Sequence, residues 1–333
     1  MSTAAADRAS AAAPADFTPL GLAVGHAGDA AGATGCTVVR GVSGPHRAAM
    51  SVVGRATGTR EAATIAPDHL VDRVDAVLLT GGSAYGLDAA AGVMRWMEER
   101  GRGFPVGPGV VPIVPAAVVF DLAPLGRFDA RPTPEMAYAA CEAAVSTGIA
   151  EGAVGAGTGT TVGKVLGPER AMKGGVGCAV ARNGALLVGA VAVVNALGDV
   201  CDAEGRIIAG ARAPGGGFAD ARRVLGSPAA LASTSFAELA MQNTTLAVVA
   251  TNALLSRVEL AQLARAAGAA LYRRITPVGT SFDGDVVFAL GPLEGRPAPA
   301  LAVEALAVDA LERAIERAVR LATGRDGVPG VAG

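Results

Sequence analysis

The sequence predicts an α/β protein, and three observations support this class. Residues 75–80 form a short apolar run between polar residues, which is typical of a buried strand. Residues 176–194 hold two more such runs, and Asn183-Gly184 between them favours a tight hairpin turn. Residues 303–323 repeat apolar residues at helical spacing, as an amphipathic helix does. Short strands and packed helices therefore share one chain.

The same patterns predict the elements in order. The expected strands are residues 36–40, 50–53, 75–80, 112–122, 176–181, 186–194, 246–251 and 286–290. The expected helices are residues 83–101, 132–148, 256–270 and 303–323. We expect a glycine-rich turn at residues 21–29, a long irregular connection at residues 202–240, and a disordered tail beyond Arg325.

Composition favours a soluble cytoplasmic protein with a large core. The chain has 333 residues, of which 51% are hydrophobic and 17% charged. The formal net charge of −2 and the 4% aromatic content give no reason to expect nucleic acid or an anionic membrane as partner. No apolar run reaches the roughly 18–20 residues of a membrane helix. Residues 1–16 lack the apolar core of a signal peptide, so we expect a flexible leader before a single domain at residues 17–325.

The cysteine and histidine positions predict neither a disulfide framework nor a metal site. The four cysteines form no C-x-x-C pair, so we expect small buried thiols. The three histidines show no spacing typical of metal ligands. We therefore expect no metal and no organic cofactor.

The stretch from Gln242 to Leu246 can be interpreted in two ways. It is either an ordinary polar turn entering a buried strand or a self-cleavage site. In the second interpretation the Thr244 hydroxyl attacks the Asn243 carbonyl, and hydrolysis of the ester leaves Thr244 as a new N-terminus. Its α-amine, with an ordinary pKa of about 7.7–8.0, can then act as a base for its own hydroxyl.

The glycine-rich residues 153–164 do not form a nucleotide-binding loop. Thr158 stands where a phosphate-binding loop needs glycine, and Val165 stands where it needs serine or threonine. What remains is a flexible loop that delivers Lys164. Lys173 is the rival candidate for an active-site lysine.

Other polar residues stand at strand ends. Asn195 ends a predicted strand and is either a turn former or an amide donor for an oxyanion. Asp283 and Asp285 precede a strand, and alternation would put both carboxylates on one side if strand geometry begins there. Two close carboxylates push their pKa values apart, although a solvated turn is the simpler interpretation.

These stretches together resemble the L-aminopeptidase/D-esterase (DmpA-like) peptidase family. The resemblance rests on Asn243-Thr244-Thr245-Leu246 with Val-Val-Ala-Thr-Asn after it, and it extends from about Gly21 to Leu290. It implies a four-layer αββα sandwich similar to the Ntn hydrolase fold. It also implies an α chain of residues 1–243 and a β chain of residues 244–333, which stay bound and commonly assemble as tetramers of the heterodimer.

The resemblance also implies roles for individual residues. Thr244 matches the family's nucleophile, Asn195 its oxyanion donor and Lys164 its lysine, while Asp283 and Asp285 match its acidic cluster. The turn at Gly81-Gly82-Ser83 matches a family motif next to the active site. The candidates for the substrate pocket are Gly82, Ser83, Tyr85 and Tyr138.

Three hypotheses for function follow. The threonine nucleophile and the aspartate pair most resemble the 6-aminohexanoate-oligomer (nylon) hydrolases, which implies an amide hydrolase for linear ω-amino-acid oligomers. The alternative within the family is an aminopeptidase or amidase for short peptides, β-peptides, or amino-acid amides and esters. A non-enzymatic binding or assembly protein on the same scaffold is the third hypothesis, and it predicts an uncut chain.

Overall fold

The computed structural model describes residues 14–227 and 243–333. Most of the expected leader, and residues 228–240 of the expected irregular connection, lie outside these ranges. The end of the leader is described, and here the expectation was wrong. Ala15 is buried, and Asp16 accepts a hydrogen bond from the Thr18 backbone N–H at 2.8 Å. No helix among the described residues has the length and apolar character needed to cross a membrane.

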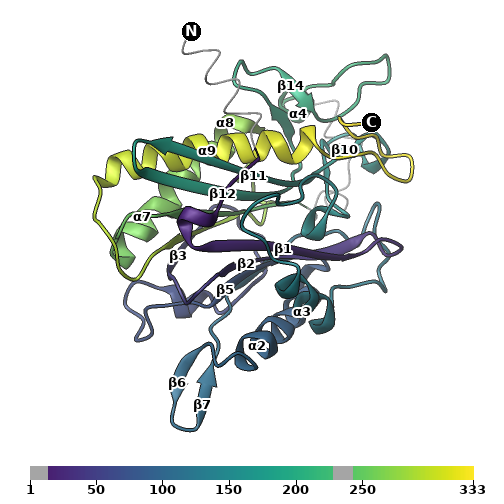
Figure 1. Cartoon of the computed structure of the whole chain (residues 1–333). Helices are drawn as coiled ribbons and strands as arrows, with labels where there is room; N and C mark the ends of the chain where they lie inside the picture. Colours follow the sequence, from purple (N-terminus) through teal and green to yellow (C-terminus); the bar gives the residue numbers. More distant parts are fainter. Residues whose placement is uncertain (1–13, 228–242) are drawn as a thin grey trace.

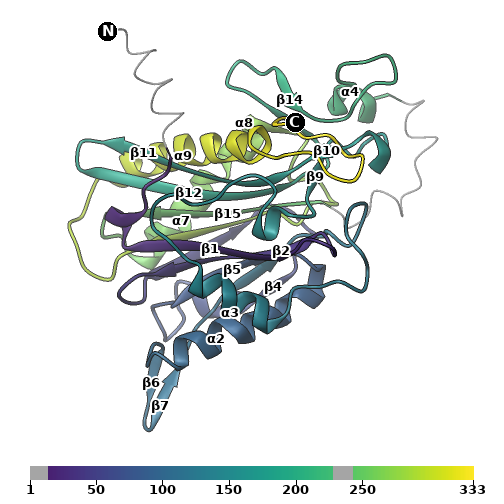
Figure 2. The same ribbon diagram turned by 45° about the vertical axis from the view of Figure 1, so that its right-hand side comes forward.

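Two five-stranded sheets form the centre of the molecule (Figures 1 and 2). The first contains, in spatial order, β1 (Leu22–Asp29), β2 (Thr34–Gly41), β5 (Ala76–Thr80), β8 (Ala116–Val118) and β4 (Thr59–Arg60). The second contains β11 (Gly175–Asn183), β12 (Leu186–Asn195), β15 (Thr244–Thr251), β17 (Val286–Gly291) and β3 (Arg47–Val52). β15 lies at the middle of the second sheet, antiparallel to β12 and parallel to β17.

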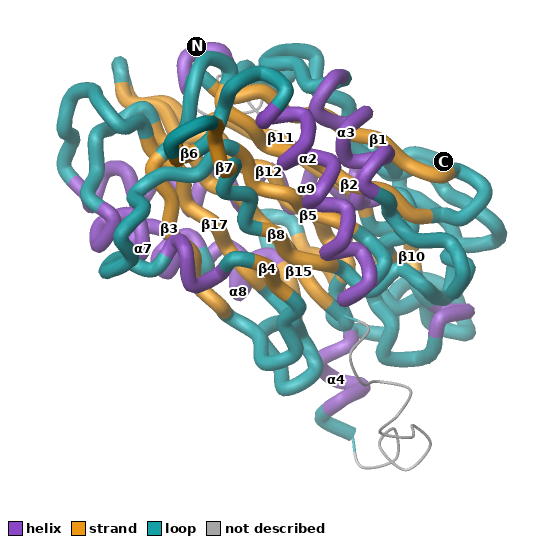
Figure 3. The backbone as a smooth tube through the Cα atoms, turned by 90° about the horizontal axis from the view of Figure 1, so that it is seen from below, coloured by secondary structure: helices purple, strands orange, loops and turns teal. Residues whose placement is uncertain are grey.

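Helices cover the outer face of each sheet. α2 (Ala90–Glu98) and α3 (Pro134–Glu142) pack on the first sheet, and Figure 3 shows them lying across its strands. α7 (Arg257–Ala267), α8 (Ala269–Arg274) and α9 (Ala300–Arg320) cover the second. A third apolar layer lies between the sheets, with residues such as Val39, Val77, Val248 and Phe288. The predicted four-layer αββα sandwich is therefore confirmed.

Shorter elements fill the edges of the sandwich. The short strands are β6 (Phe104–Val106), β7 (Gly109–Val111), β9 (Thr161–Val162), β10 (Met172–Lys173), β13 (Asp199–Cys201), β14 (Ile207–Ala209) and β16 (Ile275–Thr276). β14, β13 and β16 make a three-stranded sheet, and β9 pairs with β10. The short helices are 3₁₀ turns at Thr18–Leu20, Ala62–Ile65, Ser83–Ala89, Gly155–Gly157 and Pro168–Arg170, and α4 (Ala221–Leu225).

Several boundaries differ from the predictions for physical reasons. Residues 21–29 were predicted to be a turn, but all of them except Gly21 form β1, where Gly25 lies so close to α3 that a Cβ would meet the Ala140 carbonyl. Residues 112–122 give only the short β8, because Pro112 and Pro115 interrupt the ladder. The capping box that Ser256 and Glu259 were expected to form is present at the start of α7.

The tail beyond Arg325 is ordered, against the prediction of disorder. Arg325 and Val328 exchange backbone hydrogen bonds at 2.8 Å, and Lys173 donates its backbone N–H to Pro329 at 2.8 Å. These bonds hold the last residues against β10, so backbone pairing replaces the apolar pattern that the tail lacks.

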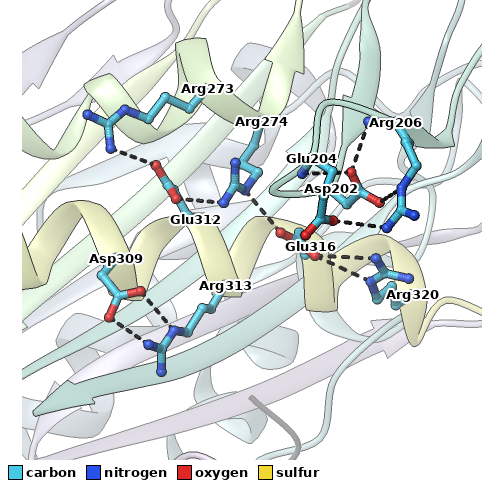
Figure 4. Close-up of polar contacts among 10 residues, drawn as sticks. All are labelled: Asp202, Glu204, Arg206, Arg273, Arg274, Asp309, Glu312, Arg313, Glu316 and Arg320. Atoms are coloured by element: carbon cyan, nitrogen blue, oxygen red, sulfur yellow. Dashed lines mark hydrogen bonds and ion pairs between the residues drawn. The ribbon is translucent and has the colours of Figure 1, made fainter. Parts of the chain in front are cut away.

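Ion pairs connect α8 to α9 (Figure 4). Arg274, which is almost fully buried at the end of α8, contacts Glu312 at 2.6 Å and Glu316 at 3.0 Å. Arg273 contacts the other oxygen of Glu312 at 3.1 Å. β16 starts directly after Arg274, so the segment that leads to Asp283 begins from a fixed point.

Close contact between α9 and β11 should make Gly177 intolerant of any side chain. A Cβ at Gly177 would lie 2.0 Å from the Ala314 carbonyl oxygen. We expect Gly177→Ala to lower the free energy of unfolding by about 1–3 kcal/mol, because the helix must move away. The control Gly109→Ala adds its methyl group in open space and should change stability by less than about 0.5 kcal/mol. Equal urea midpoints for the two variants would contradict this packing.

Candidate active site

Thr244 and Asn195 face each other at the end of the second sheet. Thr244 is the first residue of β15 and pairs in register with Asn195, the last residue of β12. Strand alternation places Thr244 on the same face as Leu246, which packs between the two sheets. Both polar side chains are buried, with exposed fractions of 5% and 1%. The nucleophile candidate and the amide candidate thus share one buried edge.

The peptide bond before Thr244 is held by two donors. The Thr244 hydroxyl donates to the Asn243 carbonyl oxygen at 2.6 Å, and the backbone N–H of Gly284 donates to the same oxygen at 2.9 Å. A Cβ at Gly284 would lie 2.7 Å from the Thr244 Oγ1, so the bare glycine lies directly against the hydroxyl. Donors on a carbonyl oxygen polarise it toward nucleophilic attack.

Lys164 fixes the orientation of Asn195. Its Nζ donates to Asn195 Oδ1 at 2.9 Å and to the Asn195 backbone oxygen at 3.0 Å. The Thr161 backbone N–H also donates to Oδ1 at 3.0 Å, while Nδ2 donates to the Phe120 carbonyl at 2.9 Å. Because two donors meet at Oδ1, the amide has one orientation only. Burial lowers the pKa of Lys164 to about 7, and the carboxylates of Asp283 and Asp285 oppose that shift.

The aspartate pair lies on the other side of Thr244. Asp285 accepts from the Thr245 backbone N–H at 2.5 Å and from that of Gly279 at 3.1 Å. Asp283 accepts from the Thr280 backbone N–H at 2.7 Å. Burial, and then the neighbouring Asp283, raise the pKa of Asp285 to about 7. β17 starts only at Val286, so a turn, and not the expected strand alternation, positions the pair.

Lys173, the rival lysine, lies elsewhere. Its Nζ donates to the carbonyl oxygens of Gly157 at 2.7 Å, Thr160 at 2.9 Å and Gly174 at 3.1 Å. The electrostatic influence of Asp283 and Asp285 falls on Lys164 instead. The geometry therefore favours Lys164 as the active-site lysine.

The turn at Gly82 and Ser83 is connected to Asn195 through Asp121 and its neighbour Phe120. Asp121 accepts from the Gly82 backbone N–H at 2.6 Å and from the Thr34 hydroxyl at 2.7 Å. Its neighbour Phe120 is the residue whose carbonyl meets Asn195. Gly82 has a φ of 80° and Ser83 a φ of 51°, so this turn is tight and left-handed. Burial raises the pKa of Asp121 to about 6.

The two tyrosine candidates do not contact the cluster around Thr244 in the structure. Tyr85 is 53% exposed and stacks against Arg131 on the surface. Tyr138 lies on α3 in the outer helix layer, and its hydroxyl donates to Glu99 at 2.6 Å. Their role in a substrate pocket stays a prediction.

Sequence reasoning missed the backbone donors of this site. The N–H groups of Gly284 and Thr161 contact the Asn243 carbonyl and the Asn195 amide, yet any residue type except proline carries such a group. Asp121 was also missed, and its only signal was a carboxyl group directly after an apolar run. No cluster of three or more potential metal ligands occurs among the described residues.

The site combines a buried hydroxyl, a polarised carbonyl, an amide donor, and a lysine beside two carboxylates. Such a set of groups is suited to acyl transfer. Comparisons with known proteins point the same way. The sequence profile of peptidase family S58 matches residues 20–331. An uncharacterized aminopeptidase of Mycobacterium bovis is 42% identical over 299 residues, which covers 83% of this chain and 83% of that protein.

Two further matches add detail. A 6-aminohexanoate-oligomer endohydrolase of Kocuria sp. (strain KY2) is 33% identical over 280 residues, which covers 81% of this chain and 72% of that protein. The solved L-aminopeptidase D-Ala-esterase/amidase of Ochrobactrum anthropi, described as a variant of the Ntn hydrolase fold, aligns with a TM-score of 0.66 at 20% identity. The alignment covers 93% of this chain and 86% of that one, and it supports the fold. Since the family profile spans nearly the whole chain, the protein belongs to peptidase family S58.

Proposed function

We propose that this protein is an autoprocessing amide hydrolase with Thr244 as its N-terminal nucleophile. The observation that carries the proposal is the position of the Thr244 hydroxyl, 2.6 Å from the Asn243 carbonyl oxygen, which Gly284 also holds. Membership of family S58 supports hydrolysis of amide bonds. The identity of the nucleophile and the substrate are the parts we propose.

Self-cleavage proceeds as an N-to-O acyl shift. The Thr244 oxygen attacks the Asn243 carbonyl carbon, its proton leaves to a neighbouring base, and the Gly284 N–H stabilises the oxyanion. The C–N bond then breaks as the Thr244 nitrogen takes up a proton. Water hydrolyses the resulting ester, which leaves a carboxylate on Asn243 and a free amine on Thr244. The candidate bases are Lys164, whose pKa is lowered by burial to about 7, and Asp285, whose pKa is raised by burial to about 7.

Turnover repeats the chemistry on an external amide. The free α-amine of Thr244 accepts the hydroxyl proton, and the Thr244 oxygen takes the acyl group while the substrate's amine leaves. Water then releases the acid and regenerates the threonine. Asn195, oriented by Lys164, is the proposed oxyanion donor. These steps need no metal or organic cofactor.

The cut chain should remain one unit. β15 begins at the cleavage point and lies between β12 and β17, so its hydrogen bonds to β12 join residues 1–243 to residues 244–333. We also propose that this unit assembles further into tetramers, as the resemblance to the family implies, and that the protein is cytoplasmic, as its composition favours.

For the substrate we propose linear 6-aminohexanoate oligomers or related ω-amino-acid amides. The support is the threonine with the Asp283 and Asp285 pair, together with the name of the Kocuria relative. The more similar Mycobacterium bovis relative is named an aminopeptidase, which favours short peptides or amino-acid amides as the second candidate.

Replacement of Thr244 tests the nucleophile and the substrate together. Thr244→Ala should show no self-cleavage and no hydrolysis, because it lacks the attacking oxygen, whereas Thr244→Ser should keep both at a reduced rate. Wild-type protein should release 6-aminohexanoate from its linear oligomers faster than p-nitroaniline from amino-acid p-nitroanilides. Two fragments from Thr244→Ala would contradict the mechanism, and the reverse substrate preference would favour the aminopeptidase hypothesis.

Self-cleavage should also accelerate as pH rises through about 7. Burial sets the pKa of Lys164 and of Asp285 to about 7, so each group becomes able to accept the hydroxyl proton only above that pH. Below it, the rate should change roughly tenfold per pH unit if one deprotonation controls the step. Precursor refolded from acid and followed by gel electrophoresis measures this rate. A rate that falls as pH rises through neutrality would show that a protonated group is required instead.

A further inference from the structure

Lys173 is a buried cation that the proposed chemistry does not use. Its side chain is fully buried in β10, and its three ammonium hydrogens are matched by three backbone carbonyl oxygens. In the part of the chain that the structure describes, no carboxylate lies within ion-pair distance of Nζ. Burial lowers the pKa of Lys173 to about 7. A buried charge without a paired carboxylate is costly, and an apolar side chain of similar length would avoid that cost.

Two of the three carbonyl oxygens that accept from Lys173 belong to the loop that leads to Thr161 and so to Asn195. Gly157 and Thr160 lie in the tight turn that leads into β9, and Gly174 follows Lys173 itself. Lys173 also pairs directly with Thr161 in the β9–β10 ladder. The ammonium therefore holds the turn from one side.

One peptide group connects the Lys173 ammonium to Asn195. The carbonyl of Thr160 accepts from Lys173 Nζ at 2.9 Å, and the N–H of Thr161 donates to Asn195 Oδ1 at 3.0 Å. These two groups belong to the same planar trans peptide, so they must point in opposite directions. Fixing the Thr160 oxygen on the ammonium fixes the direction of the Thr161 N–H. A cation at one end of such a chain also polarises the next hydrogen bond.

We propose that Lys173 is a positioning residue for Asn195, acting through the Thr160–Thr161 peptide. Among the described residues, Lys164 Nζ and the Thr161 N–H donate to Oδ1 of Asn195 and keep it turned toward them. Lys164 orients the Asn195 amide by a direct hydrogen bond. Lys173 orients the same amide indirectly, because it fixes the peptide that carries the Thr161 N–H. The catalytic consequence rests on the proposed function, whereas the orientation of the peptide does not.

The test replaces the ammonium by an apolar side chain of similar length, Lys173→Met. The Thr161 N–H should lose its fixed direction, so hydrogen exchange in residues 155–165 should become about tenfold faster or more. A misdirected Asn195 should lower kcat about tenfold or more and leave KM nearly unchanged. The matched control is Val162→Ala, which removes buried packing from the neighbouring position of β9 without removing a charge. At a loss of thermal stability equal to that of Lys173→Met, Val162→Ala should keep kcat within about twofold of the wild-type value.

A double-mutant cycle separates positioning from general destabilisation. Asn195→Ala alone should lower kcat about 10²–10³-fold, as loss of one oxyanion donor does. Adding Lys173→Met to that variant should then cost less than about twofold, because the group that Lys173 positions is already absent. An equal loss in both backgrounds, or unchanged exchange in residues 155–165, would overturn the proposal.

Two possible failures, of amide hydrolysis by the wild type and of folding by Lys173→Met, each have their own test. If wild-type protein hydrolyses no amide, the proposed function fails, and the exchange measurement in the uncut chain still decides the role of Lys173. If Lys173→Met does not fold, Lys173→Ala takes its place, with propylammonium chloride added to supply the missing cation. Slower exchange in residues 155–165 with propylammonium than with sodium chloride at equal ionic strength supports the proposal, and equal exchange overturns it.

Discussion

The pairing of β15 with its two neighbours determines the geometry of everything around Thr244. Antiparallel pairing with β12 sets Thr244 opposite Asn195, and parallel pairing with β17 sets Asn243 beside Asp283. A shift of register by one residue would turn the hydroxyl to the other face of the sheet. The close packing of β15 on both faces opposes such a shift, because it would exchange side chains of different size, such as Leu246 and Ala247, between the two cores.

The protonation states of the charged groups at this edge also depend on one another. Lys164 is buried, and the nearby carboxylates of Asp283 and Asp285 oppose the loss of its proton. The carboxylates in turn are held by backbone N–H groups at Gly279, Thr280 and Thr245. The N–H groups of Gly279 and Thr280 come from the segment that starts at β16, directly after the ion pairs between α8 and α9, and that of Thr245 comes from β15. The protonation states of the site thus depend on packing well outside it.

The resemblance to the peptidase family, more than side-chain chemistry alone, named the candidate residues of the site. From the residues alone, a turn was the simpler interpretation of Asn195, Asp283 and Asp285, and the structure brings these three together with Thr244 and Lys164 at one edge of the second sheet. The N–H groups of Gly284 and Thr161 could not be named, because every residue except proline carries one and only tertiary structure directs it. The choice between Lys164 and Lys173 also needed the structure, since both lysines lie next to glycines in the sequence and both are buried.

The fold was likewise predicted where local sequence signals determine it and missed where tertiary contacts do. The Asn183-Gly184 hairpin, the capped α7 and the long α9 follow from local signals, and all three are present. β1 was missed because its glycines are typical of a turn, whereas Gly25 lets α3 approach the strand. The ordered tail was missed because backbone bonds to Pro329 and its neighbours leave no apolar pattern.

The most direct test of the account is the intact mass of purified wild-type protein under denaturing conditions, with N-terminal sequencing of any smaller fragment. Self-cleavage at Thr244 predicts two fragments, the smaller of which begins Thr-Thr-Leu-Ala-Val. A single uncut chain that persists above neutral pH would contradict it. The binding or assembly hypothesis would then be the better description of the protein.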